Sequence, residues 1–176
     1  VVVANTNDAP TLANALVDAT VAEDAAYTLD VSAMCADVDV GDTIAYSLAG
    51  APTSLTVTSG VISGTPLNAD VGTHTITVTC TDSAGATASD SYVLTVTNVN
   101  DAPDFTSTAV TAATEDAAYS YTVTATDVDT GDSATLSGTT VPSWLTFTAA
   151  TGVLTGTPTN AEVGSHSVVI TATDTN

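Results

Sequence analysis

The feature that most constrains this chain is an internal repeat. "EDAAY" occurs at 23–27 and again at 115–119, and "DVDVGD" at 37–42 corresponds to "DVDTGD" at 127–132. "SGTPLNADVGTHTITVTCTD" at 63–82 corresponds to "TGTPTNAEVGSHSVVITATD" at 155–174. Segments that recur at one period indicate copies of one structural unit, here of about ninety residues. We therefore expect two modules joined at "NVNDAP", and we place their boundaries at 1–8 (the end of a preceding repeat and its linker), 9–99 (repeat 1) and 100–176 (repeat 2).

Within each copy the apolar residues alternate with threonines. In "THTITVTCT", His74, Ile76, Val78 and Cys80 share one face and threonines occupy the other. A period of two is typical of a strand with one buried face. The same reasoning predicts a hairpin at Ser59-Gly60, and it places every second residue of "YTLDVSAMC" inward, Ala33 included. About seven such strands with frequent turns indicate an all-β chain of two tandem β-sandwiches.

The second copy is expected to be incomplete. It stops at "TATDTN", so nothing in it corresponds to "SYVLTVTN" of the first copy, and its sandwich lacks the last strand. The opening "VVVANTNDAP" instead aligns with "LTVTNVNDAP" at 94–103. We expect Val1–Ala4 to be a strand end that fills the open groove of a second module. The donor is either a covalent neighbour in a continuous array or an identical subunit, and either arrangement builds a fibre head to tail.

The charge is one-sided: twenty acidic residues, no lysine, no arginine and a formal net charge of −20. Binding to nucleic acid or to an anionic membrane requires basic residues, so both are excluded as partners. Cations are favoured instead. We also expect no enzyme, because no catalytic constellation is evident and no basic residue could stabilise an anion. No run of apolar residues is long enough for membrane insertion.

The combined pattern of "NDAP", "EDAAY", "DVD-x-GD" and "SGTP-x-NA-D/E-VG-x-H" resembles the dystroglycan-type cadherin-like repeat. The resemblance covers nearly the whole chain. It implies a Greek-key sandwich of the immunoglobulin and cadherin type, tandem arrays on extracellular or cell-surface proteins, and Ca²⁺ at the junctions between modules.

Strand direction supports the calcium expectation, because alternating strands would bring the acidic loops of both modules to the linker. Close carboxylates repel one another by about 1 to 4 kcal/mol, depending on the local dielectric. Ca²⁺ takes six to eight oxygen ligands. The expected central junction comprises Glu23, Asp24, Asp70, Asn98, Asn100, Asp101, Asp127, Asp129 and Asp174. The expected N-terminal half-site comprises Asn5, Asn7, Asp8, Asp37, Asp39 and Asp82, and the C-terminal half-site Glu115, Asp116 and Glu162. A purely solvated acidic surface is the alternative.

Two residue pairs and one single residue also allow an interpretation. His74 and His166 hold the same place in each copy and read as corner residues that hydrogen-bond to loop backbone. Cys35 and Cys80 both point inward on facing sheets, which favours a disulfide in a secreted sandwich, although two small buried side chains would also fit. Alternation turns Trp144 outward, where it could contact a glycan. The alternative is that it covers its own sandwich.

These observations predict calcium-rigidified structural or adhesive modules of a long extracellular or cell-surface protein. Their partners would be neighbouring repeats or identical subunits arranged head to tail. A carbohydrate-binding module that uses Trp144 is the second possibility, with glycans as partners.

Overall fold

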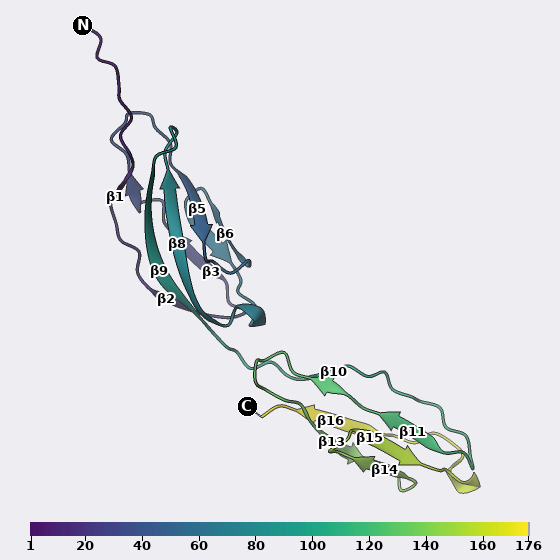
Figure 1. The fold of residues 1–176 in the computed structure, drawn as a ribbon. Coiled ribbons are helices and arrows are strands. Elements are labelled where there is room, and N and C mark those ends of the chain that lie inside the picture. The colour runs from purple at the N-terminus through teal and green to yellow at the C-terminus, as the bar shows by residue number, and fades with distance from the viewer. Residues whose placement is uncertain (176) are drawn as a thin grey trace. The chain divides into compact units, whose positions relative to one another are not determined.

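The computed structural model describes residues 1–175, so Asn176, the last residue of the expected second repeat, lies outside the described residues. The chain divides into two compact units, Val1–Val99 and Asn100–Asn176 (Figure 1). Both are all-β. The described residues contain just two short 3-10 turns, η1 (Asn68–Asp70) and η2 (Asn160–Glu162). Nothing among them has the length and apolarity of a membrane-spanning helix.

The first unit is a sandwich of two main sheets. One sheet has the order β2-β9-β8-β5, with β2 parallel to β9, and the other has the order β3-β7-β6. The short pair β1-β4 lies beside them. The strands are β1 (Thr11–Leu12), β2 (Ala19–Ala22), β3 (Tyr27–Asp30), β4 (Cys35–Ala36), β5 (Ala45–Ala49), β6 (Leu55–Thr58), β7 (Val61–Gly64), β8 (Gly72–Thr81) and β9 (Thr87–Thr97).

Alternation along the strands builds the core of the first unit. Ile76 and Val78 of β8 are fully buried, as are Leu94 of β9 and Ile62 of the opposite sheet. Threonines occupy the intervening positions of β8 and face away from this core, as a period of two requires. A disulfide joins Cys35 to Cys80, across a sequence separation of 45 residues.

The local turns follow the turn chemistry of the sequence. Ser59 and Gly60 connect β6 to β7, and both have positive φ, 50° and 77°. Two central residues of positive φ characterise the type I′ hairpin, whose twist matches that of the strands. The expected strand through "YTLDVSAMC" is wrong in its middle, because a turn interrupts it there: Met34 N donates to Val31 O at 2.9 Å. The turn buries Met34 and exposes Ala33.

The second unit repeats this plan with fewer paired strands. Its sheets are β11-β15-β14, β13-β16 and the pair β10-β12. The strands are β10 (Asp104–Phe105), β11 (Tyr119–Thr122), β12 (Ala125–Thr126), β13 (Thr135–Thr140), β14 (Leu145–Thr148), β15 (Val153–Gly156) and β16 (Val169–Thr173).

The difference between the units lies beside β16. Within residues 100–175 the partner of β16 is β13, and no strand occupies the position that β9 holds next to β8. Residues 111–114, which correspond to β2, form no strand either. Val168 is consequently 39% exposed, whereas its counterpart Ile76 is 0% exposed. The tandem sandwiches are therefore closed in unit 1 and open along one side in unit 2.

Candidate metal centres

An acidic cluster lies at one end of the first unit, in the loop "DVDVGD" between β4 and β5. Asp37 Oδ1 accepts the N–H of Asp39 at 2.8 Å, and Asp42 N donates to the carbonyl of Asp39 at 3.2 Å. These bonds coil the loop on itself. Carboxylate oxygens of Asp37, Asp42 and Asp82 then lie within 4.8 Å of one another, with Asp82 coming from the end of β8.

The segment before β1 is attached to this cluster. Asn7 Nδ2 donates to Asp82 Oδ2 at 3.0 Å, and Asp8 N donates to Asp39 Oδ2 at 2.8 Å. The hydrogen bond from Asn7 is the main cause of a lowered pKa of Asp82, with a smaller contribution from the backbone N–H of Ala86. Asp82 is thereby held as an anion. Asn5 is exposed on the same segment.

The second unit reproduces these contacts with its own residues. Asn100 Nδ2 donates to Asp174 Oδ2 at 3.1 Å, and Asp101 N donates to Asp129 Oδ2 at 2.8 Å. Asp127 Oδ1 accepts the N–H of Asp129 at 2.9 Å. The same hydrogen bonds therefore recur at corresponding residues of the two repeats.

Several oxygens in these clusters are buried without a hydrogen-bond partner. They are Asp37 Oδ2 in the first unit, and Asp127 Oδ2 and Asp129 Oδ1 in the second. The Asp129 side chain is only 4% exposed. A buried carboxylate is costly unless it is paired or binds a metal, and the chain has no lysine or arginine to pair it. The donor set is made of hard oxygens, which suit Ca²⁺.

At the other end of the first unit, Glu23 follows β2. Its N–H donates to Thr97 O at 2.9 Å, and its Oε1 accepts the N–H of Val99 at 2.9 Å. The side chain is 1% exposed, and Oε2 has no partner. Glu23 therefore holds the backbone that leaves β9 and keeps one oxygen available for a cation. Asn98 lies exposed on that backbone.

Two other expected ligands near Glu23 also have structural roles. Asp24 has a positive φ of 58° and donates its N–H to Pro66 O at 2.8 Å. Asp70 Oδ2 accepts the N–H of Leu67 at 3.1 Å and so caps η1. One carboxylate oxygen of Asp70 is thus engaged in the turn, which leaves the other as its potential ligand atom.

The second unit has the corresponding loops in a more open form. Asp116 has a φ of 60° and donates its N–H to Pro158 O at 2.7 Å. Glu162 Oε2 accepts hydrogen bonds from the hydroxyl and the N–H of Thr159, at 2.7 and 2.8 Å, and these bonds lower the pKa of Glu162. Glu115, the counterpart of Glu23, is exposed.

Two members of the clusters stand outside the ligand sets expected from the sequence. Asp42 belongs to the group in the first unit, and Asp132 lies with Asp127 and Asp129, all with oxygens within 4.8 Å. The third acid of "DVD-x-GD" recurs at the same spacing in both copies, and this recurrence was the available signal. Asp132 also accepts hydrogen bonds from Ser133 N at 2.9 Å and from Thr175.

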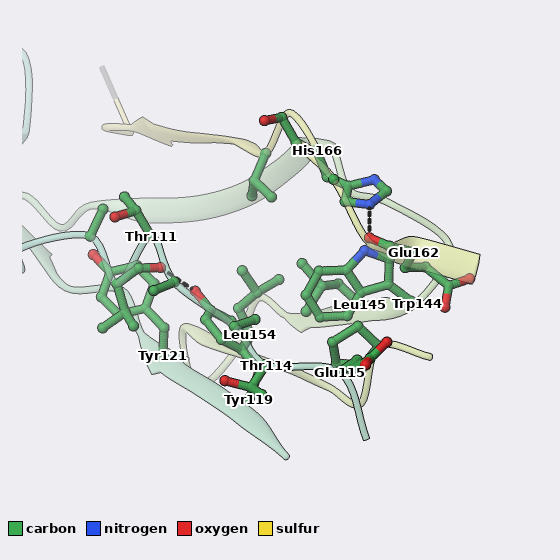
Figure 2. A pocket seen from close by; sticks show the side chains of 18 of the residues that line it. Thr111, Thr114, Glu115, Tyr119, Tyr121, Trp144, Leu145, Leu154, Glu162 and His166 are labelled. Carbon is green, nitrogen blue, oxygen red and sulfur yellow. Dashed lines mark hydrogen bonds between the residues drawn. The ribbon is translucent and has the colours of Figure 1, made fainter. Parts of the chain in front are cut away.

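The remaining singled-out residues have defined positions. The Nε2 atoms of His74 and His166 lie 2.6 and 2.7 Å from the carbonyl oxygens of Asp70 and Glu162, which is the corner arrangement. Trp144 takes the second of the two positions considered for it and covers its own sandwich. Its ring is partly buried in unit 2, edge-on to those of Tyr119 and His166 (Figure 2). The residue lies in the turn that precedes β14, where the alternation of a strand does not apply.

The fold and the clusters together define a tandem immunoglobulin-like sandwich protein with an acidic site in each repeat. The chain belongs to the family described as "Putative Ig domain", whose model matches residues 9–97 and 102–176. No curated protein matches it.

Several solved structures are similar to the chain. It is 21% identical to PcdhgB3 EC1-4, with a TM-score of 0.52, and the match covers 98% of this chain and 47% of that one. It is 16% identical to extracellular cadherin domains 3–6 of protocadherin gamma B2, with a TM-score of 0.50 and coverage of 94% and 43%. It is 26% identical to an endo-fucoidan hydrolase of glycoside hydrolase family 107, with a TM-score of 0.48 and coverage of 96% and 27%. The chain thus spans less than half of each of these proteins, and the cadherin matches show a shared fold.

Proposed function

We propose that the two units are calcium-rigidified structural or adhesive modules of a long extracellular or cell-surface protein, of the dystroglycan-type cadherin-like kind. The observation that carries this proposal is the set of buried carboxylate oxygens without partners, Asp37 Oδ2, Asp127 Oδ2 and Asp129 Oδ1, in a chain without basic side chains. One divalent cation in each of the two clusters, with a preference for hard oxygen ligands, would satisfy these oxygens.

The linker residues suggest how binding stiffens the chain. Val99 N is held by Glu23 of the first unit, and the next two residues, Asn100 and Asp101, are held by Asp174 and Asp129 of the second. Consecutive Cα atoms are only about 3.8 Å apart, so contacts of both units converge on one short stretch of backbone. Ca²⁺ bound there would fix the joint. The proposed ligands are Glu23, Asp24, Asp70, Asn98, Asn100, Asp101, Asp127, Asp129 and Asp174.

The same logic assigns the outer ends as half-sites. Asn7, Asp8, Asp37, Asp39 and Asp82 would serve a junction with a preceding module, with Asn5 on its linker. Glu115, Asp116 and Glu162 would serve a junction with a following one. A partial ligand set binds Ca²⁺ more weakly, because affinity depends on the number of charged ligands. Extracellular Ca²⁺ would keep the central site filled, which is why we place the protein outside the cell or on its surface.

Calorimetric titration of Ca²⁺ into chelator-treated protein tests the proposal. The decisive variant is Asp129→Asn, which keeps the shape of the side chain and removes one charge. Its matched control is Asp104→Asn, in the same unit and exposed outside the clusters. We expect Asp129→Asn to weaken the tightest Ca²⁺ site by at least about tenfold, or about 1.4 kcal/mol, and the control to leave it unchanged.

Small-angle scattering in the same samples tests the mechanical role. Ca²⁺ should narrow the distribution of inter-unit distances in the wild type while leaving the far-ultraviolet circular dichroism of the sandwiches unchanged. Equal Ca²⁺ affinity in the two variants would refute the site. Binding without any change in scattering would refute the stiffening and retain the site.

A further inference from the structure

β5 (Ala45–Ala49) forms one edge of the four-stranded sheet in the first unit. It stands last in the order β2-β9-β8-β5, and among residues 1–175 its only strand partner is β8 (Figure 1). Its residues pair with β8 in unbroken register, from Ala45 opposite Thr81 to Ala49 opposite Thr77. The other side of β5 therefore presents a regular row of backbone N–H and C=O groups that no strand of the described chain uses.

Edge strands of natural proteins usually carry a feature that prevents pairing with other chains, such as a charge, a proline or a bulge. β2, the opposite edge of the same sheet, is followed directly by Glu23, and β3 in the other sheet contains Asp30. β13, the counterpart of β5 in the second unit, has a break in register between Gly138 and Thr140. Within Ala45–Ala49, β5 has none of these protective features.

The charge of the chain is also kept away from this edge. Of the twenty acidic residues, none lies between Asp42 and Asp70, the segment that contains β5, β6 and β7. The second copy has the same uncharged interval, between Asp132 and Glu162. Two copies of this chain repel each other wherever their carboxylates meet, because no basic side chain is available to pair them. Along β5, two copies can touch without burying a carboxylate.

Apolar side chains at this edge are incompletely covered. Tyr46 and Leu48 pack against the core of the sandwich, yet both stay partly exposed. Their cross-strand neighbours on β8, Cys80 and Val78, are fully buried. A strand added beside β5 would cover Tyr46 and Leu48 further, so apolar burial would add to the backbone hydrogen bonds of the new pair.

We propose that β5 pairs with β5 of a second copy of this chain, in an antiparallel contact that joins the two four-stranded sheets into one. The contact lies along the side of the first unit and leaves the acidic clusters at its ends free. It supplies a lateral partner for the module, so it goes beyond the proposed calcium role and does not depend on it.

The symmetry of the contact determines its register. Antiparallel pairing of a strand with its own copy is self-complementary and closes as a two-fold dimer. The one register that pairs all five residues places Ser47 opposite Ser47 of the second copy, and Ala45 opposite Ala49. Tyr46 then lies opposite Leu48 on the core side, since alternate residues of a strand share one face. Small uncharged side chains meet on the outer face, where nothing obstructs the approach of the two strands.

Sedimentation velocity tests the dimer in chelator and about 1 M NaCl, where calcium plays no part and exposed charges are screened beyond about 3 Å. Five residues a side make a small interface, so we expect a weak association. Species of twice the 17.4 kDa monomer should increase with protein concentration. Ser47→Asp should weaken the association about fivefold or more, because it places two carboxylates opposite each other inside the contact.

The matched control is Thr75→Asp, which adds the same charge to an exposed position of β8 on the same face of the sheet. We expect this variant to associate as the wild type does. A wild-type chain that stays monomeric up to about 1 mM overturns the proposal. Equal association of the wild type and Ser47→Asp overturns it too, as does equal weakening by the two substitutions.

The variant Ser47→Cys tests the register. The natural cysteines are joined to each other, so the new thiol is the only free one. Directly opposite residues have Cβ atoms about 4.5 to 5.5 Å apart, and mild oxidation should therefore give one disulfide-linked dimer. Thr75→Cys is the control, because three strand spacings, about 14 Å, separate β8 of one copy from β8 of the other. Equal dimer from both variants, or none from Ser47→Cys, overturns the pairing of β5.

Discussion

Removing the Cys35–Cys80 disulfide should destabilise the first unit and spare the second. The two sulfurs are buried, and the bond links β4 to β8 across a separation of 45 residues. The second unit carries Ala125 and Ala172 at the corresponding positions. The double substitution Cys35→Ala with Cys80→Ala therefore gives the first unit the pair of residues that the repeat already accommodates.

The size of the effect follows from the loop that the bond closes. A cross-link over 45 residues removes about 4 kcal/mol of chain entropy from the denatured state at 25 °C, by the loop-closure relation. For a domain of this size, about 4 kcal/mol corresponds to a fall in the melting temperature of roughly 15 to 30 °C. The small volume lost with two sulfur atoms adds to this loss.

Scanning calorimetry in chelator measures the change, and the single tryptophan assigns it. Trp144 lies in the second unit, so the transition seen by its fluorescence belongs to that unit and the other transition to the first. The double variant should lower the melting temperature of the first unit only. Reductant should lower that temperature in the wild type and leave the double variant unchanged. A change below about 1 kcal/mol, or an equal shift in the Trp144 transition, would refute the loop-closure reasoning.

Three further predictions concern the first unit. Hydrogen bonds lower the pKa of Asp82. The contribution of its carboxylate to stability should therefore be complete above about pH 4 and lost as the pH falls through the lowered pKa. Melting temperatures measured against pH in chelator should fall less on the acid side in Asp82→Asn than in the wild type. Gly64→Ala would place a Cβ against the backbone oxygen of Ser54, whereas a Cβ at Gly72, which also has positive φ, meets nothing within 4 Å. Urea unfolding should show Gly64→Ala to be less stable than Gly72→Ala by about 1 to 3 kcal/mol. Tyr92→Phe removes the 3.2 Å hydrogen bond to the buried Tyr27 hydroxyl and should lower the free energy of unfolding by about 1 to 3 kcal/mol in the same assay.

Alternation and repetition in the sequence determined the class of fold and much of its interior. The period of two along "THTITVTCT" is a local property of an extended backbone, so it predicts the buried faces of Ile76, Val78 and Cys80 without knowledge of their partners. The repeat likewise predicted which loops carry acids. The prediction from alternation failed at Ala33 and Met34, because a turn between β3 and β4 interrupts the strand.

Tertiary structure alone decided which acidic oxygens gather and which are left unpaired. The distances among Asp37, Asp42 and Asp82 depend on how the "DVDVGD" loop coils and where β8 ends, and these are relations between segments far apart in sequence. It also decided the position of Trp144. Alternation along β14 would place this side chain on an outer face, but Trp144 lies in the turn before β14, and its ring lines a cavity beside Tyr119 and His166. Local sequence specifies the face that a residue prefers, and only the presence or absence of the neighbouring strand determines what that face meets.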